Sequence, residues 1–259
     1  QATDGNGNAV TWYASGVAVS PDGKKLVVSS VNSSDLLVFD LGTKQLAGTV
    51  SLGKQETFGV WFDPHDAAGS HVYVTLWQDH TLVEVDVSNP AAPSVSRTWD
   101  TQKDPQSIAF LDARWIVVGN DLGDSFTLVD RVANTTTTVP TDSRMKLYGQ
   151  EPSALAYDET NHRLYSTLAG MNAIAAYDVD VAQTPPALSF AGRLPVGYWP
   201  SAVAAESDGT VVVTNLRGHG EGPRPLYFDI GDADIGERMH GSIEAIATKR
   251  LIAGLVSHA

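Results

Sequence analysis

The chain has 259 residues, of which 42% are hydrophobic and 18% charged, and its formal net charge is −13 at pH 7. This composition is typical of a globular protein, and the negative charge repels nucleic-acid phosphates, so we expect no nucleic-acid partner. The absence of cysteine excludes disulfides, thiolate catalysis and cysteine-ligated metals. No apolar run reaches the roughly 18 residues of a membrane span, so no such span is predicted.

Five segments of the chain repeat one pattern. They begin at Ser15, Phe58, Gln106, Ser153 and Ser201, which are 43 to 48 residues apart. In the first, a short apolar strand at 17–19 leads to a tight turn, in which Pro21 presets φ and Gly23 accepts a positive φ. A β-branched strand is predicted at 26–28, a polar loop at 31–34 and a third strand that ends on Asp40. The fourth strand, "QLAGTVSLG", is more polar.

The later repeats keep this order of elements. Their third strands end on Asp86, Asp130 and Asp178, and the fifth repeat has "VVVTN" as its second strand. A glycine-rich insertion at 216–240 then separates this strand from one at 242–247, although the stretch 241–258 also fits a helix. No GK[ST] follows the glycines, which excludes a phosphate-binding P-loop. The N-terminal "NAVTWYA" is a candidate strand for completing the last repeat.

Four short strands every 40 to 50 residues predict an all-β protein, a β-propeller of four-stranded antiparallel blades. A sandwich would not need the same strand order five times. We therefore predict a single β-propeller domain over 1–259. Its five repeats lie near 15–55, 56–103, 104–150, 151–198 and 199–259.

The segments "VYVTLWQDHTLVEVDV" and "VVVTN" resemble the YVTN-type repeat of surface-layer-like and lactonase-like propellers, also called YncE-like. The stretch from "VGYWPSAVAAESDGTVVVTNLRGHGEGPRP" to "DIGERMHGSIEAI" resembles the propeller part of bacterial proteins that fuse a propeller to a phosphoesterase of the alkaline-phosphatase superfamily. The resemblance implies a secreted or periplasmic bacterial protein. It also implies a phosphoesterase domain or further blades as partners, because such propellers usually have seven blades.

Residues just before each first strand are the first candidates for a ligand site. Glu56, Asp104, Glu151 and Trp199 hold this position, which lies at one mouth of the channel in a propeller. Glu56, Asp104 and Glu151 are candidate metal ligands, since carboxylate oxygens suit hard cations such as Ca²⁺. The alternative interpretation is that they are solvated turn residues.

The loops between second and third strands face the same mouth. They and the strand ends beside them add the candidates Trp77, Asp79, His80, Asn120, Asp121, Asn215, Arg217 and His219. His80 and His219 are singled out because they fall in corresponding loops. Arg217, His219 and Arg224 place positive charge at an otherwise acidic mouth, so capture of an anion is a further hypothesis.

Three functions follow as hypotheses. The first is a non-catalytic propeller that binds a small molecule or a protein and belongs to a phosphoesterase-linked protein. The second is a lactonase-like or metal-assisted hydrolase that uses the mouth acids with His80 or His219. The third is a surface-layer-like structural module. The chain shows no GxSxG elbow and no HxH or HExxH spacing, so we favour the first.

Overall fold

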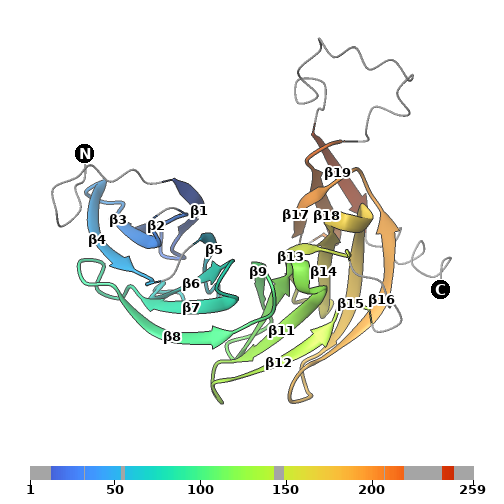
Figure 1. Cartoon of the computed structure of the whole chain (residues 1–259), viewed down its shortest axis with the longest axis horizontal. Helices are drawn as coiled ribbons and strands as arrows, with labels where there is room; N and C mark the ends of the chain where they lie inside the picture. The colour runs from blue at the N-terminus through green and yellow to red at the C-terminus, as the bar shows by residue number, and fades with distance from the viewer. Residues whose placement is uncertain are drawn as a thin grey trace, which may run out of the picture. The chain divides into compact units, whose positions relative to one another are not determined.

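The computed structural model describes residues 13–31, 33–53, 56–142, 149–206, 208–218 and 241–247. These residues form antiparallel β-strands and two short 3-10 turns, η1 (Asp121–Gly123) and η2 (Ala169–Met171) (Figure 1). Within these ranges, the structure contains no helix that has both the length and the apolar character needed to cross a bilayer.

The strands assemble into sheets that follow the order of the chain, which we call blades 1 to 5 (Figure 1). Blade 1 comprises β1 (Ala14–Val19), β2 (Lys25–Ser30), β3 (Asp35–Asp40) and β4 (Gln45–Ser51). Blade 2 comprises β5 (Thr57–Phe62), β6 (His71–Leu76), β7 (Thr81–Asp86) and β8 (Ser94–Asp100). Blade 3 comprises β9 (Pro105–Phe110), β10 (Trp115–Asn120), β11 (Ser125–Asp130) and β12 (Thr135–Pro140).

The last two blades follow the same plan. Blade 4 comprises β13 (Pro152–Asp158), β14 (Arg163–Leu168), β15 (Ala173–Asp180) and β16 (Ala187–Pro195). Blade 5 comprises β17 (Pro200–Ala205), β18 (Thr210–Asn215) and β19 (Ser242–Ala247), three strands in the part of the chain that the structure describes. The predicted all-β class with four-stranded antiparallel blades is confirmed.

The chain divides into two compact units, Gln1–Val139 with blades 1 to 3 and Pro140–Ala259 with blades 4 and 5. Each unit is described by itself below. The assignment of a single domain to residues 1–259 stays a prediction.

A shift of register marks the start of the first strand in every blade. In blade 4 this bulge falls between Pro152 and Ala154. The hydroxyl of Thr167 on β14 accepts the N–H of Ala154 at 2.8 Å and lies 3.0 Å from the hydroxyl of Ser153. Ser29 and Thr214 take the same position in blades 1 and 5. The hydroxyl group at this position of the repeat thus hydrogen-bonds to polar groups that the bulge leaves without a partner in the strand ladder.

The aspartates at the ends of third strands hold the turns that follow. Asp40 accepts the N–H of Thr43 at 2.7 Å, and Asp130 accepts the N–H groups of Val132 and Ala133, each at 2.9 Å. Blade 4 differs from the prediction, because β15 continues past Asp178 to Asp180. Asp180 then accepts the N–H of Ala182, while Asp178 pairs with Arg163. The repeated aspartate is therefore a turn-forming residue.

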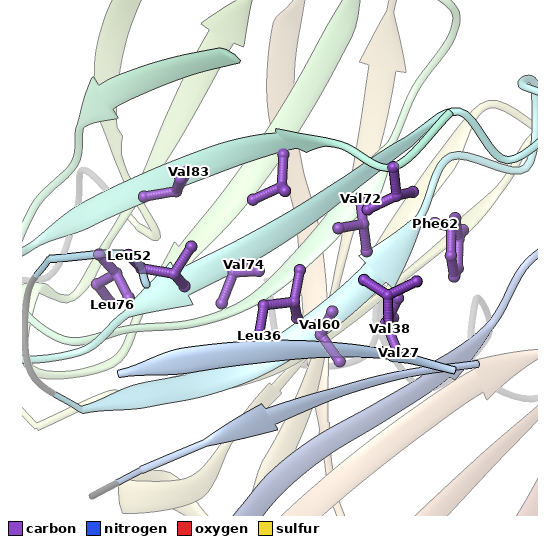
Figure 2. Close-up of a cluster of buried hydrophobic side chains, with 12 residues drawn as sticks. Val27, Leu36, Val38, Leu52, Val60, Phe62, Val72, Val74, Leu76 and Val83 are labelled. Carbon is purple, nitrogen blue, oxygen red and sulfur yellow. The ribbon is translucent and has the colours of Figure 1, made fainter. Parts of the chain in front are cut away.

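The core of the first unit lies between consecutive blades. Figure 2 shows Val27, Leu36 and Val38 of blade 1 gathered against residues such as Val60 and Val72 of blade 2. A second cluster packs blade 2 against blade 3. In the second unit, blades 4 and 5 are joined in the same way through a cluster that includes Tyr165, Ile174, Ala176, Val211 and Val213. At each of these interfaces, one face of a blade packs against the opposite face of the next blade.

Candidate functional site

We call the residue just before each first strand the lead residue. In blades 2 to 5 the lead residues are Glu56, Asp104, Glu151 and Trp199, and their φ angles are 65°, 56°, 54° and 57°. This left-handed conformation is uncommon for residues with a side chain. It turns each carbonyl toward the loop between the second and third strands.

In each blade, the carbonyl of the lead residue accepts the first N–H of that loop. The donors are Trp77, Asp121, Ala169 and Leu216, and each N···O distance is 2.9 Å. Tyr13 and Val31 make the same bond in blade 1, also at 2.9 Å. The lead residues and these loops therefore lie at the same end of their blades, which we call the lead end.

The loops between second and third strands also link successive blades. Their fourth residues, Ser34, His80, Asp124 and Asn172, have φ between 46° and 56°. Nδ1 of His80 lies 3.3 Å from the N–H of Asp104, the lead residue of blade 3, and 4.0 Å from its carboxylate. The same nitrogen is 3.1 Å from the carbonyl of Trp77. In blade 4, Oδ1 of Asn172 accepts the N–H of Trp199 at 2.9 Å.

The side chains of Asn120 and Asp121 are buried in blade 3. Asn120 is fully buried, and its amide nitrogen donates to the hydroxyl of Thr127 at 3.0 Å while its oxygen accepts the N–H of Gln102 at 3.2 Å. Asp121 is 8% exposed. Both side chains are thus placed inside the blade and not on its surface.

Trp77 and Asp79 are half-buried in the loop of blade 2. The ring of Trp77 lies 6.1 Å from that of Phe58, tilted by 45°. Its buried Nε1 has no hydrogen-bond partner among the residues that the structure describes. Trp77 therefore covers the start of β5, and it offers a ligand little surface.

An exposed patch forms at the lead end of blade 5. Tyr198, Trp199 and Leu216 have exposed fractions of 51%, 41% and 61%, and Arg217 is also exposed. The guanidinium carbon of Arg217 lies 4.8 Å from the centre of the Trp199 ring, a cation–π contact. We call these four residues the aromatic–arginine patch. Trp199 and Arg217 are among the candidates that the sequence indicates, whereas Tyr198 and Leu216 are not, although both adjoin a candidate.

The backbone beneath the patch is held by a short ladder. The N–H of Leu216 donates to the carbonyl of Trp199 at 2.9 Å, and the N–H of Arg217 donates to that of Tyr198 at 3.1 Å. The N–H of Tyr198 donates in turn to Gly218 at 2.6 Å. The patch is therefore built on paired backbone and not on a free loop.

Asn215 and Glu244 lie next to this ladder. Asn215 is 2% exposed, and its amide nitrogen donates to Oε1 of Glu244 at 2.7 Å. The N–H of Gly197 donates to the same Oε1, also at 2.7 Å. The amide oxygen of Asn215 is buried and accepts no hydrogen bond from the residues that the structure describes. Glu244 thus fixes the connector that carries Tyr198 and Trp199, a role that the sequence did not indicate.

The structure does not test the prediction that Glu56, Asp104 and Glu151 bind a metal ion. Glu56 and Asp104 belong to the first unit and Glu151 to the second. Among the described residues, no group of three or more His, Cys, Asp or Glu side chains is arranged to hold a metal ion. His219, Arg224 and residues 219–240 of the predicted insertion lie outside the described residues.

A network of buried charges joins blades 2 and 3 at the end of unit 1 opposite the lead end. Nη1 of Arg131 donates to Asp63 at 2.5 Å and to the hydroxyl of Tyr73 at 2.9 Å. Tyr73 donates to Oε2 of Glu84 at 2.8 Å, and Arg97 donates to both oxygens of this carboxylate at 2.9 and 2.7 Å. Such bidentate, charge-assisted bonds are among the stronger polar contacts in proteins.

The pKa values in this network favour the ion pairs. Burial opposes ionisation of Glu84, but hydrogen bonds from Arg97, Ser96 and Tyr73 outweigh it and lower the pKa of the carboxyl group. Burial raises the pKa of the Tyr73 phenol. Burial works against the charged form of Arg131, yet its bonds to Tyr73 and Asp63 raise its pKa. The network is therefore charged at neutral pH, with Tyr73 as the neutral link.

The fold and the lead end place the chain in the class of β-propellers. No protein-family model matches the sequence, and a comparison with curated proteins finds no significant match. Many solved structures, 1395 chains, are similar to it, so the fold by itself does not define an activity.

Two of these structures are informative about the fold. Hydrazine synthase of Kuenenia stuttgartiensis is similar with a TM-score of 0.71 and 15% identity, covering 96% of this chain and 67% of that one. A functionally unknown protein from Desulfotomaculum acetoxidans is similar with a TM-score of 0.65 and 12% identity, covering 81% of this chain and 67% of that one. At these identities the similarity shows the fold alone.

Proposed function

We propose that the protein is a non-catalytic binding propeller whose aromatic–arginine patch receives an anionic ligand. The observation that carries the proposal is the stack of Arg217 on the exposed ring of Trp199. Exposed aromatic and arginine side chains are enriched where proteins bind partners. Arg217 supplies charge and hydrogen-bond donors, while Tyr198, Trp199 and Leu216 supply apolar surface.

The charge state of Arg217 supports an anion as the ligand. Arg97, Arg114, Arg131 and Arg163 each form an ion pair with a carboxylate. Among the described residues Arg217 forms no such ion pair, and its guanidinium carbon lies 4.8 Å from the centre of the Trp199 ring. A carboxylate or phosphate group is the natural partner for a guanidinium fork.

The rigid backbone at the lead end supports binding as well. The ladder between residues 198–199 and 216–218 and the hydrogen bond that the N–H of Trp199 donates to Asn172 hold the patch in one arrangement. A surface that is already ordered loses less conformational entropy when a ligand binds. We infer that the blades serve as a scaffold for this patch.

The wider setting of the protein is also a proposal. We propose that the chain is the propeller portion of a secreted or periplasmic protein that is linked to a phosphoesterase. The sequence around "VVVTNLRGHGEGPRP" supports this, as does the strand at 242–247 that follows it. A surface-layer-like structural module is the alternative for the same patch, with a protein as its partner.

Isothermal titration calorimetry with two probes tests the binding function. Benzoate combines a carboxylate with an aromatic ring, and inorganic phosphate offers charge alone. We expect benzoate to bind more tightly, and the Arg217→Ala variant to weaken its binding by roughly 10- to 100-fold, as the loss of a charge-assisted hydrogen bond implies.

Lys103 provides a matched control for this titration. It is exposed and stands just before the lead residue of blade 3, as Tyr198 does in blade 5. The Lys103→Ala variant should keep the wild-type affinity. Equal affinities of wild type, Arg217→Ala and Lys103→Ala for both probes would overturn the proposal.

A hydrolase is the second candidate function, and the pair His80–Asp104 favours it. Nδ1 of His80 lies 4.0 Å from the Asp104 carboxylate, and Glu56 precedes the same blade 2. A histidine beside a carboxylate is a common general base. Here, however, Nδ1 also lies within 3.3 Å of a backbone N–H of the next blade, which gives His80 a structural role.

A further inference from the structure

The connector between blades 4 and 5, residues 196–199, is held at every backbone N–H group. The four acceptors, in chain order, are the carbonyl of Asn172, Oε1 of Glu244, the carbonyl of Gly218 and Oδ1 of Asn172, at distances of 2.9, 2.7, 2.6 and 2.9 Å. Glu244 lies on β19, 47 residues after the Gly197 that it holds. The connector ends in two residues of the aromatic–arginine patch, so the arrangement of the patch depends on β19.

Blade 3 has the corresponding connector without a glutamate. Gln102 corresponds to Gly197, since each lies two residues before its lead residue. The N–H of Gln102 donates to Oδ1 of Asn120 at 3.2 Å. The amide nitrogen of Asn120 donates to the hydroxyls of Ser125 and Thr127 at 3.2 and 3.0 Å. In blade 3 the asparagine itself therefore holds the connector.

Blade 5 keeps this group of side chains but changes its last member. The amide nitrogen of Asn215 donates to the hydroxyl of Ser242 at 3.2 Å and to Oε1 of Glu244 at 2.7 Å. In the strand ladder, Glu244 takes the place that Thr127 has in blade 3. The glutamate side chain is longer, and the same oxygen also accepts the N–H of Gly197 at 2.7 Å. The carboxylate thus replaces the asparagine as the group that holds the connector.

Gly197 allows the connector to lie this close to its neighbours. A Cβ atom at residue 197 would lie 2.5 Å from the carbonyl oxygen of Gly218 and 2.8 Å from the amide nitrogen of Asn215. Both distances are shorter than a van der Waals contact, so a side chain would displace the backbone. Gln102 carries a side chain at the corresponding position of blade 3. The glycine and the glutamate together therefore distinguish the connector of blade 5.

We propose that Glu244 is a positioning residue for the anion site and that it acts through the connector. Its Oε1 holds Gly197, and the next two residues carry the rings of the patch. With the connector held, the ring of Trp199 lies 4.8 Å from the guanidinium carbon of Arg217. A carboxylate forms stronger hydrogen bonds with N–H groups than the neutral amide oxygen of blade 3 does. This inference rests on the binding function proposed for the patch.

NMR spectroscopy of the full chain follows the contact between Trp199 and Arg217 without a ligand. The ring of Trp199 should shift the δ protons of Arg217 upfield, and Trp199→Ala identifies this shift by removing the ring. We expect Glu244→Ala to lose most of the shift, because the connector is no longer held. Glu244→Gln keeps an oxygen that accepts both N–H groups, so it should keep the shift.

Calorimetry with benzoate measures the consequence for binding. Glu244→Ala should weaken binding by roughly tenfold, because fewer molecules have the arrangement that binds, and Glu244→Gln should stay within about threefold of the wild type. Thr127→Val is the matched control, because it removes the hydrogen bond at the same position of blade 3 and should leave the affinity unchanged. If circular dichroism shows that Glu244→Ala does not fold, Gly197→Ala replaces it, since its Cβ displaces the same connector.

The two measurements separate this inference from the proposed function. If the wild type shows the shift but does not bind benzoate, the binding function is overturned, and loss of the shift in Glu244→Ala still supports the positioning role. A wild type without the shift would overturn both. The positioning role is also overturned if the shift and the affinity survive in Glu244→Ala, or if Glu244→Gln or Thr127→Val loses them equally.

Discussion

The amide oxygen of Asn172 accepts the backbone N–H of Trp199 at 2.9 Å, and this bond ties the loop of one blade to the lead residue of the next. His80 holds the corresponding position toward Asp104, at 3.3 Å. The two side chains differ in type but share a left-handed backbone, with φ of 51° and 53°. The lead end is thus organised by a repeated device that links successive blades.

This link predicts a graded loss of stability at residue 172. Asn172→Ala removes the hydrogen bond and leaves a residue with a Cβ at φ 51°, so we expect the free energy of unfolding to fall by about 2 kcal/mol. Asn172→Gly removes the bond but tolerates the backbone, so about 1 kcal/mol is expected. Urea denaturation measures both. Equal stability of the two variants and the wild type would contradict this role.

The bulge of blade 4 predicts a role for the Thr167 hydroxyl. Thr167→Val keeps the shape of the side chain but leaves the N–H of Ala154 without its partner at 2.8 Å. We expect a loss of about 1–3 kcal/mol in the free energy of unfolding, the cost of an unsatisfied donor that is partly buried. Thr167→Ser restores the hydroxyl and should recover most of this loss. If Val and Ser behave alike in urea denaturation, the hydroxyl is not the important group.

The ion pair between Asp130 and Arg114 predicts that the stability of the fold depends on pH. The hydrogen bonds from Arg114, at 3.0 and 2.6 Å, lower the pKa of Asp130 from 3.8 to about 2. A carboxyl group whose pKa is lowered in the folded state stabilises it above the unfolded pKa and loses this effect as the pH falls through the folded pKa. We expect the contribution to be complete above about pH 5 and to disappear toward pH 2.

The comparison of wild type with Asp130→Asn measures this contribution. The difference in their midpoints of thermal unfolding should be constant from pH 6 to 8, shrink below pH 4 and be small near pH 2. The difference in unfolding midpoint between the wild type and Arg114→Met should depend on pH in the same way. A difference that does not change with pH would mean that the ion pair does not stabilise the fold.

The position of Tyr73 allows a prediction of how much the buried charge network contributes to the free energy of unfolding. Its hydroxyl lies between Arg131, at 2.9 Å, and Glu84, at 2.8 Å. Tyr73→Phe should lower the free energy of unfolding by about 1–3 kcal/mol, because both charged partners lose a buried hydrogen bond. Tyr13→Phe is the control, since Tyr13 is 57% exposed. A Tyr73→Phe variant as stable as this control would show that the network is dispensable.

The sequence predicted the blades because their strands, turns and terminal aspartates repeat with a regular spacing. It did not predict the left-handed lead residues, because Glu56, Asp104 and Glu151 have side chains, and glycine is the residue that most clearly indicates a positive φ in a sequence. The extension of β15 past Asp178 depends on Asp180 holding the next turn, and both residues fit the motif equally well.

The sequence indicates the loops at the lead end as candidates, but loop position alone does not tell which of their side chains the fold buries. The sequence predicts Asn120 to be a polar residue at the mouth, yet it is fully buried and hydrogen-bonded within blade 3. Tyr198 and Leu216 are exposed because of the ladder at residues 198–218, which joins segments that are distant in sequence. Long-range pairing of this kind is not visible in the local pattern of residues.

The most direct test of the proposed anion-binding function compares two sets of variants in one pair of assays. One set is Arg217→Ala, and the other combines Glu56→Gln, Asp104→Asn and Glu151→Gln. We predict that Arg217→Ala loses affinity for benzoate in calorimetry, while the triple variant binds benzoate as the wild type does and leaves hydrolysis of a panel of lactones unchanged. If the wild type hydrolyses lactones and the triple variant does not, the non-catalytic function is contradicted and an enzyme is favoured.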